Sequence, residues 1–283
     1  MPDPTPSLSQ YERMQRVLQL LEVRDAVQVS ELAKLFSISE VTVRADLAEL
    51  ARQGLVARVR GGARAIERGQ SELGFDLRLP VEARRKQAIA RAAAAMVGEG
   101  EAVALDSSTT AYYLALELRA KRELVVVTNG LLIAAALADA PGINVLVTGG
   151  MLRLQAMSLV GDVTSGVLRE TTITTGFLGA RGLSLERGLM DLNPEEVRVK
   201  DAMARACERV IGIFDCTKWN RTALLSFVPA ERVDAIVTDS GAPVADVEAW
   251  RARGTEVVIA DANAADGQGT PPRDLLRRRE GVA

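Results

Sequence analysis

The sequence predicts an α/β protein with a small, mainly helical N-terminal domain and a larger domain built on a mainly parallel sheet. Between residues 9 and 66, apolar residues recur at helical spacing and then give way to two short extended runs. Between residues 81 and 260, helical segments alternate with short, continuous apolar runs, as in strands buried on both faces. A chain of 283 residues has room for both domains.

The composition excludes several kinds of active site. The chain has no histidine, so a Ser-His-Asp triad and any histidine-ligated zinc or iron site are impossible. Its two cysteines, Cys207 and Cys216, lack metal-ligand spacing and are too few for a disulfide framework. We therefore expect no metal, no cofactor and a reduced, cytoplasmic compartment.

The N-terminus and the charge balance narrow the partners. The first ten residues have neither a basic start nor an apolar run, and no stretch reaches the ~20 apolar residues that span a bilayer. We expect a soluble protein without a membrane partner. The formal net charge is −2, so any affinity for nucleic acid must come from a local basic patch.

A helix beginning after Ser39 is the central element of the N-terminal domain. The Ser39 hydroxyl can accept a hydrogen bond from a free backbone N–H one turn later. Val43, Leu47 and Leu50 then recur at helical spacing, and Gly54 is expected to end the helix. The opposite side of this helix is polar.

Two further helices are predicted upstream. One runs from about Ser9 to Val23, and a shorter one, capped by Ser30, runs from Val29 to Phe36. A tight turn at residues 37 and 38 joins the shorter helix to the central one. This helix-turn-helix pattern lets the N-terminal end of the second helix enter a DNA major groove, although an ordinary pair of packed helices has the same spacing.

A β-hairpin is predicted after the helices, with Gly61-Gly62 between extended runs at residues 55–60 and 63–66. Helices followed by a small hairpin form a winged helix. No acidic residue interrupts the arginines of this segment, which are Arg52, Arg58, Arg60 and Arg64. Alone they would be a solvated surface, but beside the helix pair they favour contacts with phosphates that weaken as salt rises.

The strands of the larger domain are predicted at residues 102–105, 124–128, 143–147, 174–178, 210–214, 235–238 and 256–259. In parallel sheets, ligands bind beyond the carboxyl ends of the strands. Several strands end in polar or glycine residues, and the first opens into a helix through a run of hydroxyls that can cradle an anion. The sequence therefore predicts a small anionic, polyhydroxylated ligand at this edge.

In both predicted domains the chain resembles the DeoR family of bacterial transcription regulators. The N-terminal resemblance rests on Glu31-Leu32-Ala33, on Ser39-x-x-Thr42-Val43-Arg44-x-Asp46-Leu47 and on Gly54-Leu55 with Arg60-Gly61-Gly62-Ala63. In the larger domain it rests on Asp106 with Ser108-Thr109-Thr110, Thr128-Asn129, Gly149-Gly150, Phe177-Leu178-Gly179-Ala180, Glu196 with Lys200, and Asp215-x-Thr217-Lys218.

The resemblance implies a winged helix-turn-helix followed by an α/β sensor domain similar in fold to sugar-phosphate isomerases and coenzyme A transferases. Such sensors bind a phosphorylated sugar or related metabolite and change their grip on DNA. Three departures from the family pattern bear on specificity. Ala45 stands where a second basic residue is frequent, Arg60 where histidine is frequent, and Ser108 where glycine is usual, which would narrow the phosphate loop.

The expected organisation is a disordered lead-in (1–8), a winged helix-turn-helix domain (9–66), a linker (67–80), an effector-sensing domain (81–260) and a poorly ordered tail (261–283). The expected DNA-binding residues are Ser39, Glu40, Thr42, Arg44, Arg58, Arg60, Gly61 and Gly62. The expected effector-binding residues are Asp106, Ser108, Thr109, Thr110, Thr128, Asn129, Gly149, Gly150, Arg153, Gly179, Glu196, Lys200, Asp215 and Lys218.

The leading hypothesis is a DNA-binding repressor of carbohydrate-metabolism genes, modulated by a phosphorylated sugar. A single winged helix reads few bases, so a homo-oligomer, dimer or tetramer, on repeated half-sites of a double-stranded DNA operator is expected. An isomerase-like enzyme that uses Asp106, Glu196 or Lys218 as acid or base is the alternative. A metabolite-sensing adaptor whose helix pair binds protein is a third possibility.

Overall fold

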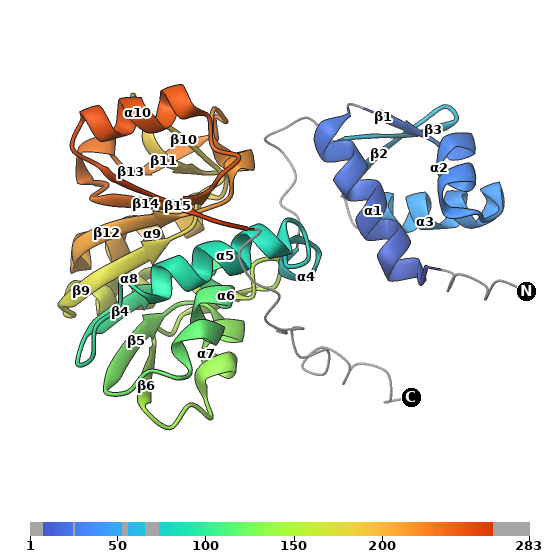
Figure 1. Cartoon of the computed structure of the whole chain (residues 1–283). Coiled ribbons are helices and arrows are strands. Elements are labelled where there is room, and N and C mark those ends of the chain that lie inside the picture. Colours follow the sequence, from blue (N-terminus) through green and yellow to red (C-terminus); the bar gives the residue numbers. More distant parts are fainter. Residues whose placement is uncertain (1–7, 25, 53–55, 66–73, 263–283) are drawn as a thin grey trace, which may run out of the picture.

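The computed structural model describes residues 8–24, 26–52, 56–65 and 74–262. Its N-terminal part contains three helices and a small sheet (Figure 1). In chain order the elements are α1 (Gln10–Val23), β1 (Ala26–Gln28), α2 (Val29–Phe36), α3 (Glu40–Arg52), β2 (Val56–Val59) and β3 (Gly62–Ala65). This is the predicted winged helix-turn-helix.

The helix boundaries follow from local capping. Ser9 and Glu12 form a reciprocal capping box at the start of α1. The predicted cap of α3 is also present, because the backbone N–H of Thr42 donates to the Ser39 hydroxyl at 3.1 Å. The predicted Ser30 cap is wrong: α2 begins at Val29, so Ser30 lies inside the helix. The predicted end of α3 at Gly54 lies outside the described residues.

The small sheet has the order β1-β3-β2, and β1 was not predicted. In the hairpin Val59 pairs with Gly62, so the turn residues are Arg60 and Gly61 rather than the glycine pair. Gly61 takes a positive φ of 83°, which suits glycine. A Cβ on Gly62 would lie 2.0 Å from the carbonyl oxygen of Val27, so only glycine fits between the strands there.

The larger part of the chain is built on a seven-stranded parallel sheet with the order β15-β14-β12-β9-β4-β5-β6. Every predicted strand is present, within one to three residues at its ends. The strands are β4 (Ala102–Leu105), β5 (Leu124–Thr128), β6 (Ile143–Val147), β9 (Ile173–Leu178), β12 (Cys207–Ile213), β14 (Ala235–Asp239) and β15 (Glu256–Ala260).

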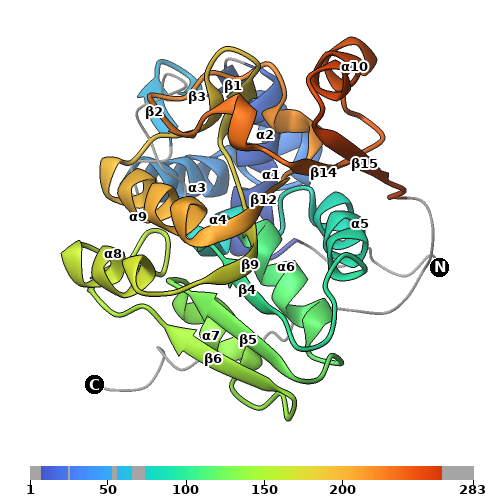
Figure 2. The same ribbon diagram turned by 90° about the vertical axis from the view of Figure 1, so that its left-hand side faces the viewer.

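Helices cover both faces of this sheet (Figures 1 and 2). Those on one face are α5 (Ala83–Ala94), α6 (Thr109–Leu118) and α7 (Leu131–Leu137), and those on the other are α8 (Asp162–Arg169), α9 (Pro194–Ala206) and α10 (Val244–Ala252). Successive strand residues therefore enter different cores. Val103 and Leu105 of β4 pack with α5 and α6, whereas Ala104 packs in the cluster of α9 and α10.

The two edge strands are less buried than the central ones, since Asn144, Leu146 and Val147 of β6 and Glu256 and Ile259 of β15 are exposed. The prediction of strands buried on both faces does not hold at these two edges. Among the described residues, no helix is long and apolar enough to cross a membrane.

Several short elements were not predicted. A hairpin of β7 (Met151–Arg153) and β8 (Ser158–Val160) follows β6, and an antiparallel sheet combines β10 (Gly182–Ser184), β11 (Gly188–Asp191) and β13 (Leu225–Val228). Residues 75–78, inside the predicted linker, form the short helix α4 (Phe75–Arg78), and Phe75 is buried in the core around α5 and α6.

Candidate functional site

The predicted DNA-contacting end of α3 is exposed and polar. Ser39, Glu40 and Arg44 are exposed, and Thr42 is half-buried. The hydroxyls of Ser39 and Thr42 lie 2.9 Å apart, and Arg44 donates to Glu40 at 2.8 Å one turn away. These exposed side chains can exchange their mutual contacts for contacts with DNA at little cost, because surface ion pairs are weak.

The β2–β3 hairpin lies against α3. Arg58 of β2 is exposed, and its guanidinium donates to the backbone carbonyl of Arg44 at 3.1 Å. Arg60 and Gly61 form the exposed turn. Gly62 is the exception among the predicted DNA-contacting residues: it is buried between β1 and β2, so its role is to let the strands approach.

Two features of this surface were missed from the sequence. Val41, in the first turn of α3, is 74% exposed, and an apolar side chain there can contact a thymine methyl group. Behind the surface, Arg13 of α1 holds the buried Asp46 of α3 through hydrogen bonds of 2.7 and 3.1 Å. This paired geometry fixes the orientation of α3 on α1.

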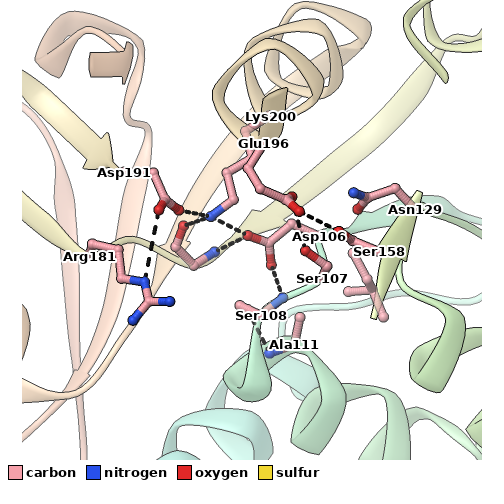
Figure 3. A network of polar contacts seen from close by, with 12 residues as sticks. Asp106, Ser107, Ser108, Ala111, Asn129, Ser158, Arg181, Asp191, Glu196 and Lys200 are labelled. Carbon is pink, nitrogen blue, oxygen red and sulfur yellow. Dashed lines mark hydrogen bonds and ion pairs between the residues drawn. The ribbon is translucent and has the colours of Figure 1, made fainter. Parts of the chain in front are cut away.

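Asp106, directly after β4, is the centre of a buried polar network (Figure 3). Its carboxylate accepts hydrogen bonds from the backbone N–H groups of Ser108 at 3.2 Å and Gly179 at 2.9 Å. The ammonium group of Lys200 lies 3.0 Å from the same carboxylate. The carboxylate that follows β4, the backbone that follows β9 and the ammonium group of α9 are thereby brought together.

Lys200 is buried but fully paired. Besides Asp106, its ammonium contacts Asp191 at 2.6 Å and the carbonyl of Gly179 at 2.9 Å, and Arg181 lies 3.8 Å from Asp191. Burial by itself would lower the pKa of Lys200, but the two carboxylates raise it above its usual value. Likewise, burial would raise the pKa of Asp191, but Lys200 and Arg181 hold it below its usual value. The charged forms are therefore the stable ones at neutral pH.

Glu196, one turn before Lys200 on α9, makes a second set of contacts. Its carboxylate accepts from Arg153 at 2.8 Å, from Ser107 at 3.2 Å and, through a short hydrogen bond, from Ser158. Glu196 and Ser158 are both buried (Figure 3). The network thus pairs three cations with three carboxylates: Lys200, Arg153 and Arg181 with Asp106, Asp191 and Glu196. An anionic ligand must therefore compete with a carboxylate for its cation.

Ser108 occupies the N-terminus of α6. Its hydroxyl accepts from the backbone N–H of Ala111 at 3.1 Å, which uses one of the free donors that an anion would bind. A Cβ on Gly179 would lie 2.4 Å from the Cβ of Ser108, so the two positions are in close contact. Thr109 and Thr110 are buried in the first turn of α6.

At the neighbouring strand ends, some polar atoms are already used and others are not. The Thr128 hydroxyl donates to the Leu105 carbonyl at 2.7 Å and accepts from Gly130 at 3.0 Å, so its role is to join β4 and β5. The Asn129 side-chain oxygen and the Thr148 hydroxyl are buried without a hydrogen-bond partner. Such unsatisfied atoms are unusual in a folded protein and are expected where a ligand or water binds.

Glycine is required beside these atoms. Gly149 and Gly150 take φ values of 74° and 116°, and a Cβ on Gly150 would lie 2.4 Å from the carbonyl oxygen of Val160. The carbonyl of Gly149 accepts from Thr164 of α8. The predicted glycine pair therefore brings the end of β6 close to β8 and α8.

Asp215 and Lys218 have contacts apart from this network. Asp215, after β12, accepts from the backbone N–H of Thr217 at 3.0 Å, and Lys218 donates to the Thr217 hydroxyl at 3.0 Å. Burial would raise the pKa of Asp215, but the positive charge of Lys218 holds it below its usual value. Asp239 and Arg85 contact one another nearby at 3.3 Å. The predicted effector residues thus divide into two groups, one around Asp106 and one around Asp215.

Asp191, Arg181 and Ser158 were missed as site residues. Asp191 ends β11, and Ser158 begins β8; both belong to short antiparallel strands that the sequence did not predict. Arg181 follows Gly179 by two residues, and a cation so close to a predicted site glycine was the available signal. Over the described ranges, no group of three or more Cys, Asp and Glu side chains is placed to hold a metal ion.

Comparison with known families accounts for both parts of this geometry. Residues 13–69 match the DeoR-like helix-turn-helix domain, and residues 81–240 match the DeoR C terminal sensor domain. The chain belongs to the DeoR family. The DeoR family consists of DNA-binding transcriptional regulators, not enzymes, and the chain is such a regulator.

Relatives match along almost their whole length. The chain is 31% identical to the HTH-type transcriptional regulator GolR of Listeria innocua, over 89% of this chain and 99% of the relative. It is 30% identical to the glycerol-3-phosphate regulon repressor of Escherichia coli K12, over 84% of this chain and 94% of the relative.

Solved structures are more distant. A ribose 5 phosphate isomerase A from Neisseria gonorrhoeae matches at 18% identity and a TM-score of 0.36, covering 47% of this chain and 52% of the isomerase. The eIF2B beta subunit from Chaetomium thermophilum matches at 15% identity and a TM-score of 0.41, covering 81% of this chain and 79% of that subunit. Neither likeness carries a functional argument. The expected likeness to coenzyme A transferases stays a prediction.

Proposed function

We propose that this DeoR-family protein is a repressor of carbohydrate-metabolism genes, and that a phosphorylated sugar or related metabolite bound at the Asp106 network modulates its grip on an operator. The observation that carries the proposal is the pairing, in one chain, of an exposed recognition helix with a buried network of cations and carboxylates. One relative is named as the repressor of a glycerol-3-phosphate regulon, which supports the same class of effector here.

In this proposal, the first turn of α3 enters the major groove and the hairpin lies along the phosphates. Ser39, Glu40, Thr42 and Arg44 contact DNA from α3, and Arg58, Arg60 and Gly61 contact it from the wing. We add Val41 to this set because it is the exposed apolar side chain of that turn.

The chemistry of the buried network suits an effector with both charge and hydroxyl groups. Arg153 and Lys200 offer cations to a phosphate, and Asn129, Thr148 and Glu196 offer partners to hydroxyls. The raised pKa of Lys200 keeps its ammonium protonated at neutral pH, so Lys200 is a binding group and a poor general base. Asp215 and Lys218 have no place in this version of the site.

The remaining parts of the proposal concern assembly and location. A winged-helix domain (residues 9–66), a linker (67–80) and a sensor (81–260) make one protomer. Two or four protomers bind repeated half-sites, because one winged helix contacts too few bases for genomic specificity. The protein works in the cytoplasm, where it reaches chromosomal DNA.

The test begins with DNA selection. Sheared DNA from the source organism is incubated with the full chain, the bound fragments are sequenced, and enriched sites are remade as labelled probes. Binding is then measured at two salt concentrations. The proposal expects one or a few enriched sites and an affinity that falls as salt rises.

The effector is then sought on the same probes. Glycerol 3-phosphate, ribose 5-phosphate and several hexose monophosphates are added, each beside its unphosphorylated parent. The proposal expects that one phosphorylated compound alters operator affinity and that its parent does not. Absence of any enriched site at low salt, with and without every compound, would refute the DNA-binding part.

A further inference from the structure

The hairpin of β7 and β8 joins the buried network to the start of the sensor domain, and we propose that it transmits effector occupancy to the winged helix through α4. This inference rests on the proposed function, because it explains how that function would be controlled. Its physical content is a chain of contacts from Glu196 to Arg153 and Ser158, from the hairpin tip to Phe75, and from α4 to the winged-helix core.

The first link is the attachment of both hairpin strands to one carboxylate. Arg153 ends β7, and Ser158 begins β8. Both donate to the same oxygen of Glu196, while Ser107 holds the other oxygen. Since Glu196 is 3% exposed, its carboxylate has little water to replace these donors. Glu196 therefore attaches the tip of the hairpin to α9.

The second link is at the hairpin tip. The backbone N–H of Phe75, the first residue of α4, donates to the carbonyl of Gln155 at 2.7 Å. A first-turn N–H has no acceptor within its own helix, so the hairpin tip satisfies it from outside. The ring of Phe75 lies edge-on to Tyr112 of α6 with centroids 5.7 Å apart. The position of the start of α4 therefore depends on the position of the hairpin tip.

The third link leaves the sensor. Leu77, two residues after Phe75, packs against the core of the winged helix, whereas Leu79 packs against the sensor core. α4 therefore contacts the interiors of both domains within five residues of chain. Leu77, which makes the contact with the winged helix, thus lies two residues from Phe75, whose backbone the hairpin holds.

The effector acts on the first link. An anion that binds Arg153 competes with Glu196, because a guanidinium pairs with phosphate and carboxylate in the same geometry. Loss of the Arg153–Glu196 pair weakens the attachment of the hairpin tip to α9, while the backbone pairing of β7 with β8 remains. The effector then favours the arrangement in which the Gln155 carbonyl no longer holds Phe75. Operator affinity changes by the factor with which the effector prefers that arrangement.

A double-mutant cycle tests this coupling without knowing the effector. Glu196→Gln weakens the hold on Arg153 while nearly preserving shape, and Leu77→Ala removes the contact of α4 with the winged helix. Glu196→Gln is expected to change operator affinity by about fivefold or more in the parent chain and by less than about twofold in the Leu77→Ala chain. Hydrogen exchange of the peptide containing Phe75 should be faster in Glu196→Gln.

Leu79→Ala is the matched control, since it is the same change two residues away on the side that faces the sensor core. The effect of Glu196→Gln on operator affinity should persist there. Thermal unfolding of each full-length variant shows that it is folded. An equal effect of Glu196→Gln with and without Leu77 overturns the inference, as does an unchanged affinity in Glu196→Gln itself. A parent chain that binds no DNA refutes the proposed function instead.

Discussion

The two domains of this protein place their charged side chains in opposite environments. On the winged helix, Arg44 and Glu40 form an exposed pair with side chains 57% and 47% accessible. In the sensor, Lys200 and Asp106 form a pair with 6% and 1% accessible. Exposed charges are available to a partner and contribute little to folding, whereas removing one member of a buried pair leaves the other charge buried and uncompensated. Substitutions should therefore separate function from stability in one domain and not in the other.

The largest effect is expected from Lys200→Met. Removing the ammonium leaves Asp106 and Asp191 buried without their cation, which costs about 3–5 kcal/mol of unfolding free energy. Urea unfolding of the full chain, followed by the fluorescence of Trp219 and Trp250, which both lie in the sensor, measures this loss. Arg205→Met is the control, since Arg205 lies on the same helix in an exposed pair with Asp201, and its removal should cost no more than about 1 kcal/mol. An equal loss of unfolding free energy in the two variants would contradict the inference that the buried carboxylates depend on Lys200.

The Arg13–Asp46 pair would break the contrast, because it is a buried ion pair inside the winged helix. Asp46→Asn loses charge-assisted hydrogen bonds and should destabilise that domain by about 1.5–3 kcal/mol. Unfolding followed by hydrogen exchange of α1 and α3 measures it. Glu49→Gln, which removes a surface pair with Arg52 on the same helix, should leave unfolding unchanged.

Arg44→Ala should separate binding from folding. Operator affinity is expected to fall by about 1–3 kcal/mol for a base contact, with unfolding unchanged. Titration of the selected operator probe measures the affinity. Arg24→Ala removes an equally exposed cation paired with Glu31, and it should leave operator affinity unchanged. A loss of affinity in Arg24→Ala as large as in Arg44→Ala would point to general electrostatics.

The wing is expected to act through phosphates and not through bases. Arg60→Gln should reduce the slope of log affinity against log salt by about 1 and weaken binding to all sequences alike. Operator and random probes, each titrated over a salt series, measure this. Arg205→Gln changes an exposed arginine of the sensor and should leave the slope unaltered. A slope that stays the same in Arg60→Gln removes that residue from the interface.

The pH dependence of the sensor sharpens the comparison further. Asp191 has a pKa below its ordinary 3.8, so its contribution to stability is present above that value and is lost as pH falls through the lowered pKa. Lys200 has a pKa above its ordinary 10.5, so its contribution is complete below that value and is lost at higher pH. Sensor stability should be flat near neutrality and decline in acid, and Asp191→Asn should flatten the acid decline.

The sequence predicted the parallel sheet well because its strands are continuous apolar runs between helices. The same logic missed β10, β11 and β13, which are three or four residues long and pair antiparallel beside the main sheet. Asp191 was missed with them. Asp191 ends the antiparallel strand β11, whereas the rule for ligand sites concerns the ends of parallel strands.

The candidate site was predicted in outline and not in detail. Asp106 and Gly179 come together because the neighbouring parallel strands β4 and β9 end at one edge, and α9 places Lys200 against them. Residue type alone did not reveal that the Thr128 hydroxyl bonds backbone atoms on both sides. The position of Asp215 at the same edge also did not fix its partners, since its carboxylate turns toward its own loop.

The order of strands in the sheet has a consequence for folding. The hydrogen bond from Gly179 to Asp106 spans 73 residues, and β4 reaches its position only when β9 has paired beside it. The site is therefore a product of late, long-range pairing and is absent from a chain that has formed only β4, β5 and β6. A metabolite that binds the finished network would stabilise the completed sensor against local opening and proteolysis, so the amount of regulator in the cell would rise with its own effector.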